Sequence, residues 1–332
     1  MRLFTVELTR LRWRRAVVIL LVGCVVIPAL LWAGLAWSTR PVSEAEIQQA
    51  KDIVAQNSQA NQQALDDCLS NPGDFGIPDG EDAEQLCPQY TGSAEDYRWY
   101  LTREPLDVAG ERQGTGLAVI SLVAALMMLL GTTFAGHDWN SGSMSNQLLF
   151  EPRRRRVWLA KAAAVFLTAL VASAVVLALW WGAVWLLAGS RDVQASGHAW
   201  GMIAASAARG SLLAAGAAVG GYALTMLFRS TVATLGVMFA VAVAGQAVFV
   251  AVLGESAMRW VLPTNIAAFL FNGYRYYDGS SGTECVDIGN GAVECGGGMA
   301  HLSLAFGSAY LLVLLGIAAA LSLWSFQRRD VP

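Results

Sequence analysis

Six long apolar runs constrain this chain more than any other feature of its sequence. They are continuous and do not alternate, which favours helices over the strands of a barrel. Each approaches the roughly 20 residues that a helix needs to cross about 30 Å of hydrocarbon. Of the 332 residues, 55% are hydrophobic and only 14% are charged, so this apolar mass is expected to face lipid. We predict an all-α polytopic membrane protein with six transmembrane helices, at about residues 16–37, 114–136, 159–188, 200–228, 231–253 and 302–324.

Charged residues divide unevenly between the two ends of these runs. With a cytoplasmic N-terminus, the inner pieces hold 13 of the 22 basic residues and only four of the 25 acidic ones, Glu7, Asp138, Glu151 and Asp330. Basic residues concentrate on the cytoplasmic side of a membrane. We therefore predict a multi-pass protein of the cell membrane with both termini in the cytoplasm.

This topology divides the chain into three parts. Residues 1–37 form an amphipathic interfacial helix and the first span. A cleavable signal peptide is the less favoured alternative, because no clear cleavage site follows the apolar run. Residues 38–112 form an extracytoplasmic segment that begins with a helix-like stretch; the competing interpretation is a solvated acidic cap without ligand specificity. Residues 113–332 hold spans two to six, with a cytoplasmic loop at 137–160 and an outer segment at 254–301. Within the latter, residues 261–271 are too short to cross and predict a re-entrant or interfacial helix started by Pro263, followed by a turn-rich stretch.

Cysteine positions agree with this orientation. Cys24 lies within the first span, whereas the other four cysteines fall in the two outer segments, where disulfides persist. Each pair closes a short local loop, so we predict two disulfide bonds, Cys68–Cys87 and Cys285–Cys295.

Three polar residues within or beside the apolar runs are candidates for lining a pathway: Arg209, Gln246 and Asn265. Arg209 lies either on an interfacial ramp before a span that starts near Ser211, which we favour, or in a polar cavity between helices. Gln246 has the simpler interpretation of bonding a neighbouring helix.

No catalytic or ligand-binding motif is recognisable. A phosphate-binding loop ends in Lys followed by Ser or Thr, yet Lys51 precedes an aspartate and Lys161 an alanine. The three histidines are scattered, with no metal-ligand spacing. We predict no enzyme activity, metal site, cofactor or nucleic-acid partner for this chain, and the basic run 153–156 has the alternative role of an anchor to anionic lipid.

The stretch from Asp138 to Lys161 lies between two spans and holds the densest positive charge. It follows the end of the second span, Gly131-Thr-Thr-Phe-Ala-Gly, and contains Asn-Ser-Gly-Ser-Met, Leu148-Leu149, a Pro-Arg step and a lysine that opens the third span. This pattern resembles the permease subunits of type 2 ABC exporters. The resemblance extends to the order of spans and the broken hairpin before the last one. Family members often carry Glu where this chain has Asp138, and its first outer segment is longer than in minimal members.

The resemblance implies a homodimer, or a heterodimer with a similar permease, in the lipid bilayer and bound to two separate ABC ATPase subunits that hold ATP and Mg. A surface helix near residues 141–150 would insert into each ATPase, with Met144, Leu148 and Leu149 as its apolar contact. The coupling residues implied are Asp138, Asn140, Gly142, Met144, Asn146, Leu148, Leu149, Pro152, Arg153 and Lys161.

The cargo is not identified by any residue. Few charges lie deep in the spans, which favours a hydrophobic or amphipathic substrate such as a drug, antibiotic or lipid-like molecule, although sodium export is known among relatives. The alternative function is a membrane-bound sensor or assembly scaffold without transport.

Overall fold

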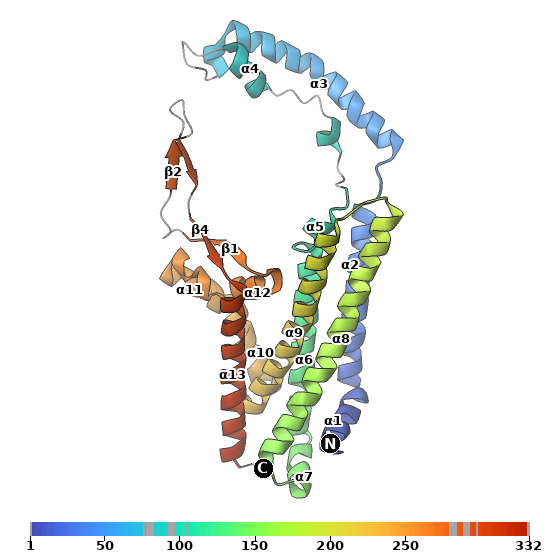
Figure 1. The fold of residues 1–332 in the computed structure, drawn as a ribbon, viewed down its shortest axis with the longest axis vertical. Coiled ribbons are helices and arrows are strands. Elements are labelled where there is room, and N and C mark those ends of the chain that lie inside the picture. Colours follow the sequence, from blue (N-terminus) through green and yellow to red (C-terminus); the bar gives the residue numbers. More distant parts are fainter. Residues whose placement is uncertain are drawn as a thin grey trace. The chain divides into compact units, whose positions relative to one another are not determined.

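The computed structural model describes residues 2–75, 77, 83–91, 97–101, 103, 105–278, 284–287, 293–296 and 298–330. Most of them are helical (Figure 1). The α-helices are α1 (Arg2–Arg12), α2 (Arg15–Ser38), α3 (Glu44–Ser70), α4 (Ala83–Thr91), α5 (Val108–Glu111), α6 (Thr115–Asn140), α7 (Ser143–Phe150), α8 (Arg154–Ser190), α9 (Gly197–Phe228), α10 (Thr231–Phe239), α11 (Gln246–Leu253), α12 (Leu262–Phe271) and α13 (Leu304–Arg328). The strands are β1 (Tyr274–Tyr277), β2 (Glu284–Asp287), β3 (Val293–Gly296) and β4 (Met299–Leu302).

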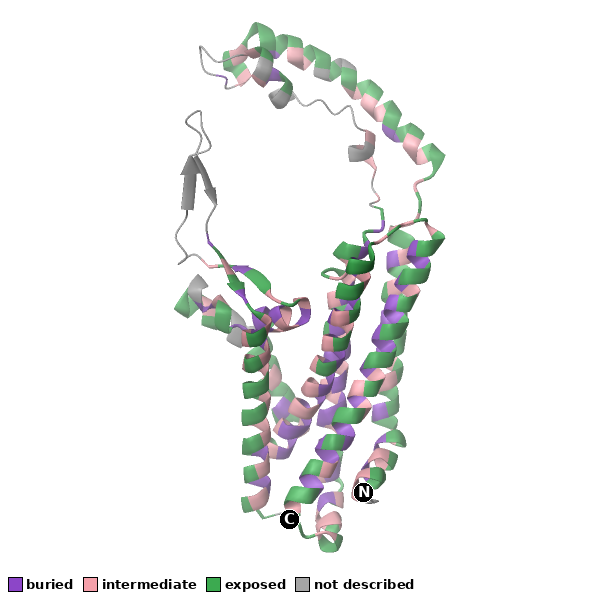
Figure 2. Cartoon of the chain, viewed as in Figure 1, coloured by how far each residue is buried: buried purple, intermediate pink, exposed green. Residues whose placement is uncertain are grey.

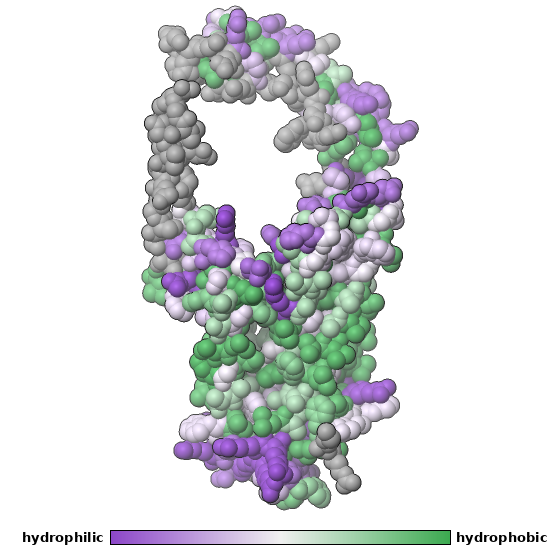
Figure 3. Space-filling view, viewed as in Figure 1, coloured by the Kyte–Doolittle hydropathy of each residue, from purple (hydrophilic) through white to green (hydrophobic). Residues whose placement is uncertain are grey.

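The chain divides into two compact units. The first contains Met1–Trp32, Val108–Gly189 and Gln194–Pro332, and the second contains Ala33–Asp107 with Ser190–Val193. Among the described residues, five helical stretches are long and apolar enough to cross a membrane: α2, Val108–Asn140 (α5 and α6), α8, α9 and α13. On the face drawn in Figure 3, hydrophobic residues form a band across the first unit. These features indicate a multi-pass helical membrane protein.

The centre of the first unit is the contact between α6 and α9, whose backbones touch. A Cβ atom added at Gly131 would lie 1.9 Å from the Ala218 carbonyl oxygen, and one at Gly221 would lie 2.4 Å from that of Met128. Glycine at both positions therefore permits this approach. By contrast, a Cβ atom added at Gly216 or Gly220 of α9 would meet only Leu315 of α13, at 3.7 and 3.9 Å.

Burial falls from this centre outward (Figure 2). Half of the most apolar window of α9 is buried, compared with 6% in α13 and 17% in α2. The outward sides of α2, α8 and α13 consist of exposed apolar residues, as expected for helices that face lipid. Side-chain bonds help to hold α8 in this unit: the Trp158 indole donates to Ser322 of α13 (3.1 Å), and Ser173 donates to the Ser211 carbonyl of α9 (3.3 Å).

The predicted fifth span is not a single α-helix. α10 ends at Phe239, a π-helical stretch follows at Ala240–Gly245, and α11 continues to Leu253. A π turn shifts the side chains around the axis without changing the apolar composition, so the sequence pattern alone predicted an unbroken helix. Six spans are therefore not confirmed.

The outer segment predicted as turn-rich contains strands, so the prediction of an all-α fold is wrong there. β1 pairs with β4 and β2 with β3, both antiparallel. Aromatic residues in Tyr274–Tyr277 favour an extended backbone, and Tyr276 packs with Ala268 and Leu302. The short helix predicted at 261–271 is present as α12, with Pro263 in its first turn.

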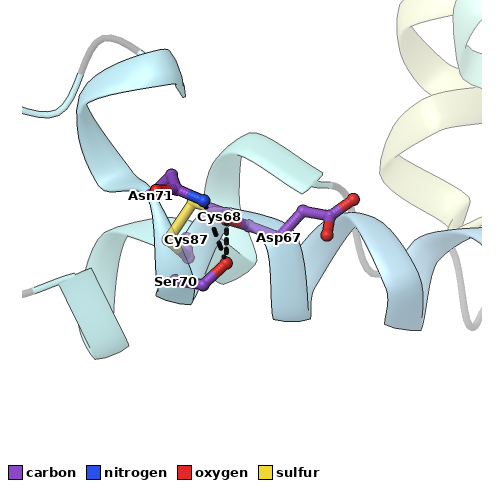
Figure 4. The surroundings of a disulfide bond; sticks show 5 residues. All are labelled: Asp67, Cys68, Ser70, Asn71 and Cys87. Carbon is purple, nitrogen blue, oxygen red and sulfur yellow. Dashed lines mark hydrogen bonds between the residues drawn. A yellow bond between two sulfur atoms is a disulfide. The ribbon is translucent and has the colours of Figure 1, made fainter.

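The second unit is a helical hairpin joined by a disulfide bond (Figure 4). α3 is the helix-like stretch expected at the start of the outer segment. It begins with a capping box between Ser43 and Glu46. Cys68 near the end of α3 is bonded to Cys87 of α4, which confirms the first predicted disulfide. Both cysteines are buried with Ile77 in a small local core.

Candidate functional site

The end of the first unit that carries α7, here called the α7 end, contains a tight reversal of the chain. α6 stops at Asn140 and Gly142 has a φ of +67°, a conformation that favours glycine. The Ser143 hydroxyl donates to Asp138 Oδ1 (2.9 Å), which ties the start of α7 to the last turn of α6. A separate helix of eight residues is therefore present where a surface helix was predicted.

Beside this reversal, four charged side chains form a network, here called the ion network: Glu7 of α1, Arg14 between α1 and α2, Asp138 of α6 and Lys161 of α8. The Lys161 ammonium lies 2.6 Å from Asp138 Oδ2 and 3.0 Å from Glu7 Oε2. Arg14 donates to the other oxygen of Asp138. The side chains of Glu7, Asp138 and Lys161 are fully buried. The buried carboxylates are thus compensated by cations, as buried charges require, and Arg10 Nη1 also lies 3.5 Å from Glu7 Oε1.

Neutral groups complete the network and extend it to α7. The Gln147 amide of α7 donates to Glu7 Oε1 (2.5 Å), and Arg14 also donates to the Phe134 carbonyl (2.7 Å). The Phe134 ring lies beneath both cations, 4.7 Å from Arg14 Cζ and 5.2 Å from Lys161 Nζ. Consequently α1, α6, α7 and α8 share one set of polar contacts.

The far end of α7 presents two apolar side chains to the surroundings. Leu149 is 81% exposed and Phe150 is 90% exposed. Figure 3 shows hydrophobic surface at this tip, next to hydrophilic surface at the same end of the unit. Exposed aromatic and aliphatic residues this close together on a short rigid helix are typical of contacts with another molecule.

The structure separates the predicted coupling residues into two groups. Asp138, Met144 and Lys161 are buried within the chain, so the expectation that Met144 faces a partner is wrong. Met144 lies on the side of α7 that packs inward, whereas Leu149 and Phe150 follow on the open side. Leu148 is partly buried, and the remaining predicted residues are exposed: Asn140, Gly142, Asn146, Pro152 and Arg153.

The basic run 153–156 has a mixed role. Arg154 Nη1 donates to the carbonyls of Phe326 (2.9 Å) and Arg329 (2.6 Å), so it caps the C-terminus of α13. Arg153, Arg155 and Arg156 are exposed. Only these three arginines of the run are available for lipid or a partner.

A cavity of about 350 Å³ opens at the same end. Its lining residues are Thr133, His137, Asn140, Ser141 and Thr231. This lining offers hydroxyl, amide and imidazole groups but no carboxylate. Within the part of the chain that the structure describes, no cluster of three or more potential metal ligands occurs.

The predicted pathway residues lie apart from the ion network. Arg209 lies within the unbroken helix α9, and its guanidinium donates to the Leu270 carbonyl at the end of α12 (3.2 Å). The stretch before Ser211 therefore continues into the span as one helix, and its position relative to the membrane stays a prediction. Asn265 of α12 is fully buried and donates to the carbonyls of Arg259 and Val261, both at 2.9 Å. The side chain of Gln246 lies outside the described residues.

The second predicted disulfide is compatible with the backbone. Cys285 and Cys295 face each other directly in the register of β2 and β3. Opposed residues of an antiparallel pair have Cα atoms about 4.5–5.5 Å apart, within the range that a disulfide spans. The two side chains themselves lie outside the described residues, so this bond stays a prediction.

Sequence reasoning missed Glu7 and Arg14. A signal for Glu7 was present, because it is the only acidic residue before Glu44 and lies four residues from both Leu3 and Leu11. Helical spacing places it on the apolar side of α1, where a lone charge needs a buried partner. No equivalent signal marks Arg14 among the neighbouring arginines.

No family model, curated protein or solved structure matches this chain.

Proposed function

We propose that this chain is the membrane-spanning permease subunit of an ATP-driven exporter of the type 2 ABC kind. A separate ATPase, which binds ATP and Mg, drives it through α7. The observation that carries the proposal is the connection of an exposed apolar tip, Leu149 and Phe150, to the ion network that holds α1, α6 and α8.

The α7 end can transmit force for a physical reason. A partner groove that encloses Leu149 and Phe150 removes apolar surface from water and fixes the tip. The ion network is buried and compensated, so separating its members is costly. Movement of the partner therefore shifts the ends of α6 and α8 together with α1. In this proposal the α7 end and both termini are cytoplasmic.

The transported molecule is hydrophobic or amphipathic, and two copies of the chain, or one copy with a similar permease, form the pathway. The poorly buried apolar sides of α2 and α13 support a larger assembly in the bilayer, since both helices have apolar surface left for lipid or a second copy. The chain itself has no enzymatic role.

The second candidate function is a sensor or assembly scaffold. The compact second unit, with its own disulfide and core, favours it, because such a unit can bind a partner independently of transport. In that case an ATPase is not a stoichiometric partner.

Purification of the tagged chain from its native membrane in mild detergent tests these alternatives. The exporter proposal expects an ATP-hydrolysing protein in a stoichiometric amount and its loss in Leu149→Glu and Phe150→Glu. Leu69→Glu, an exposed leucine of α3 in the second unit, is the matched control and retains the partner. If the α7 variants retain the ATPase as well as the control does, the coupling role of α7 is wrong.

A further inference from the structure

Two arginines meet at the opposite end of the first unit, near the last turn of α12. Arg209 of α9 donates to the Leu270 carbonyl (3.2 Å), and Ser206 donates to the same oxygen (3.1 Å). Arg112, just before α6, lies with its Cζ 5.1 Å from the centre of the adjacent Phe271 ring. Both guanidinium groups thus converge on consecutive residues of one helix end, here called the α12 end.

These cations lack the compensation found at the α7 end. No described carboxylate forms an ion pair with either of them. Glu111, next to Arg112 in the sequence, instead accepts a hydrogen bond from Thr115. A guanidinium has five N–H donors, yet Arg209 uses one of its nitrogens here, and the Arg112 guanidinium makes no hydrogen bond to a described residue. The Arg112 backbone N–H donates to the Ala109 carbonyl (3.4 Å).

Their depth along the helices is that of lipid headgroups. The 20 residues from Arg209 to Phe228 rise about 29 Å between the first and the last, which is close to the thickness of bilayer hydrocarbon. With the C-terminal end of α9 at one membrane boundary, Arg209 reaches the other, and Arg112 precedes the spanning part of α6. Both side chains are partly exposed, so a ligand at that boundary can reach them.

We propose that Arg112 and Arg209 bind an oxyanion of the phosphate class at the α12 end. A phosphate offers several acceptor oxygens, and the planar fork of arginine binds such groups through paired hydrogen bonds. The Phe271 ring and the exposed apolar helices beside it suit the attached hydrocarbon of an amphipathic ligand. The phosphate belongs to a lipid headgroup or to a soluble molecule, and this binding does not depend on the proposed exporter function.

The experiment uses the full chain in nanodiscs of phosphatidylcholine with and without phosphatidylglycerol, and measures lipids retained after extraction by native mass spectrometry. Soluble inorganic phosphate, added to the chain in neutral detergent, is the second probe. We expect Arg112→Gln and Arg209→Gln each to weaken phosphatidylglycerol retention about tenfold, the equivalent of one charge-assisted hydrogen bond. Arg275→Gln, which removes an exposed arginine of β1 at the same end, is the matched control and changes retention little.

Arg112 decides the test if Arg209→Gln unfolds. The Arg112 guanidinium makes no hydrogen bond to a described residue, and its replacement leaves the backbone bond to Ala109 and the cap on Leu270 intact. Thermal unfolding of each variant confirms the fold. Arginine-dependent binding of phosphatidylglycerol alone identifies a headgroup site, and similar binding of inorganic phosphate identifies a site for the free oxyanion. If both variants retain phosphatidylglycerol and bind phosphate as the Arg275→Gln control does, the site does not exist.

Discussion

The two ends of the first unit handle positive charge in opposite ways. At the α7 end, Lys161 and Arg14 meet the carboxylates of Asp138 and Glu7 inside the protein. At the α12 end, Arg112 and Arg209 meet only a ring and a carbonyl oxygen among the described residues. Compensated charges hold helices together, whereas uncompensated ones remain able to take a ligand. In our proposals the α7 end has a mechanical role and the α12 end has a binding role.

Removing the central cation of the ion network is the most severe test of this contrast. Lys161→Met leaves Glu7 and Asp138 buried without their shared ammonium, so we expect a loss of about 3–5 kcal/mol in the free energy of unfolding. Denaturant titration of the purified chain in detergent measures it. Arg112→Met, the equivalent change at the α12 end, is expected to cost less than about 1 kcal/mol. Equal losses would remove the distinction between the ends.

The centre of the unit depends on backbone contact and not on charge. Gly131→Ala places a methyl group 1.9 Å from the Ala218 carbonyl oxygen and forces α6 and α9 apart. We expect a loss of about 1–3 kcal/mol in the same titration. Gly216→Ala is the matched control, because its new methyl group meets only Leu315 at 3.7 Å. A Gly131 variant as stable as this control contradicts the close packing.

Glu7→Gln tests whether α1 is held by the network. The amide keeps the shape of the side chain but loses the charge opposite Lys161, while Asp138 still compensates the lysine, so we expect a loss of about 1–2 kcal/mol. A cysteine placed at Leu11, which is buried, reports detachment of α1 through faster thiol labelling. Glu44→Gln on α3 is the control, and unchanged labelling in Glu7→Gln indicates that other contacts hold α1.

The smallest effect is expected at an exposed charge in the second unit. Hydrogen bonds from the Ser43 backbone and hydroxyl lower the pKa of Glu46 below its ordinary value of 4.5, with the Arg103 guanidinium adding to the effect. Because the pKa is lowered on folding, this contribution to the start of α3 is present above pH 4.5 and is lost as the pH falls through the lowered pKa.

Hydrogen exchange of the first turn of α3 measures this contribution. We expect protection to fall in acid in the natural chain and to be low throughout in Ser43→Ala, which removes the hydroxyl of the capping box. A first turn that stays equally protected across the acid range shows that the cap does not hold the helix.

Sequence predicted the parts of the fold that depend on composition and local pattern. Five apolar runs became long helices, the helix-like stretch at the start of the outer segment is α3, and the short spacing of Cys68 and Cys87 gave the correct disulfide. The π-helical stretch at Ala240–Gly245 and the strands around Tyr276 were missed, since both depend on how backbone hydrogen bonds are shared and leave the apolar pattern unchanged.

Prediction of the site was partial for a related reason. The surface helix was predicted from local sequence, whereas Asp138 and Lys161 were named only through the family resemblance, and their role in a site stays a prediction. Their partner Glu7 lies 154 residues from Lys161, and only the fold brings the two together. Which side of an eight-residue helix faces outward also depends on packing, which is why Met144 was assigned to the wrong side.

The most direct measurement is photo-crosslinking from position 150 in living cells, with a photoreactive amino acid in place of Phe150. The account predicts an adduct between this chain and a protein that carries a phosphate-binding loop, identified by mass spectrometry, and no such adduct from the buried position 144. Adducts with lipid or extracytoplasmic proteins alone would contradict the assignment of α7 as the contact with an ATPase.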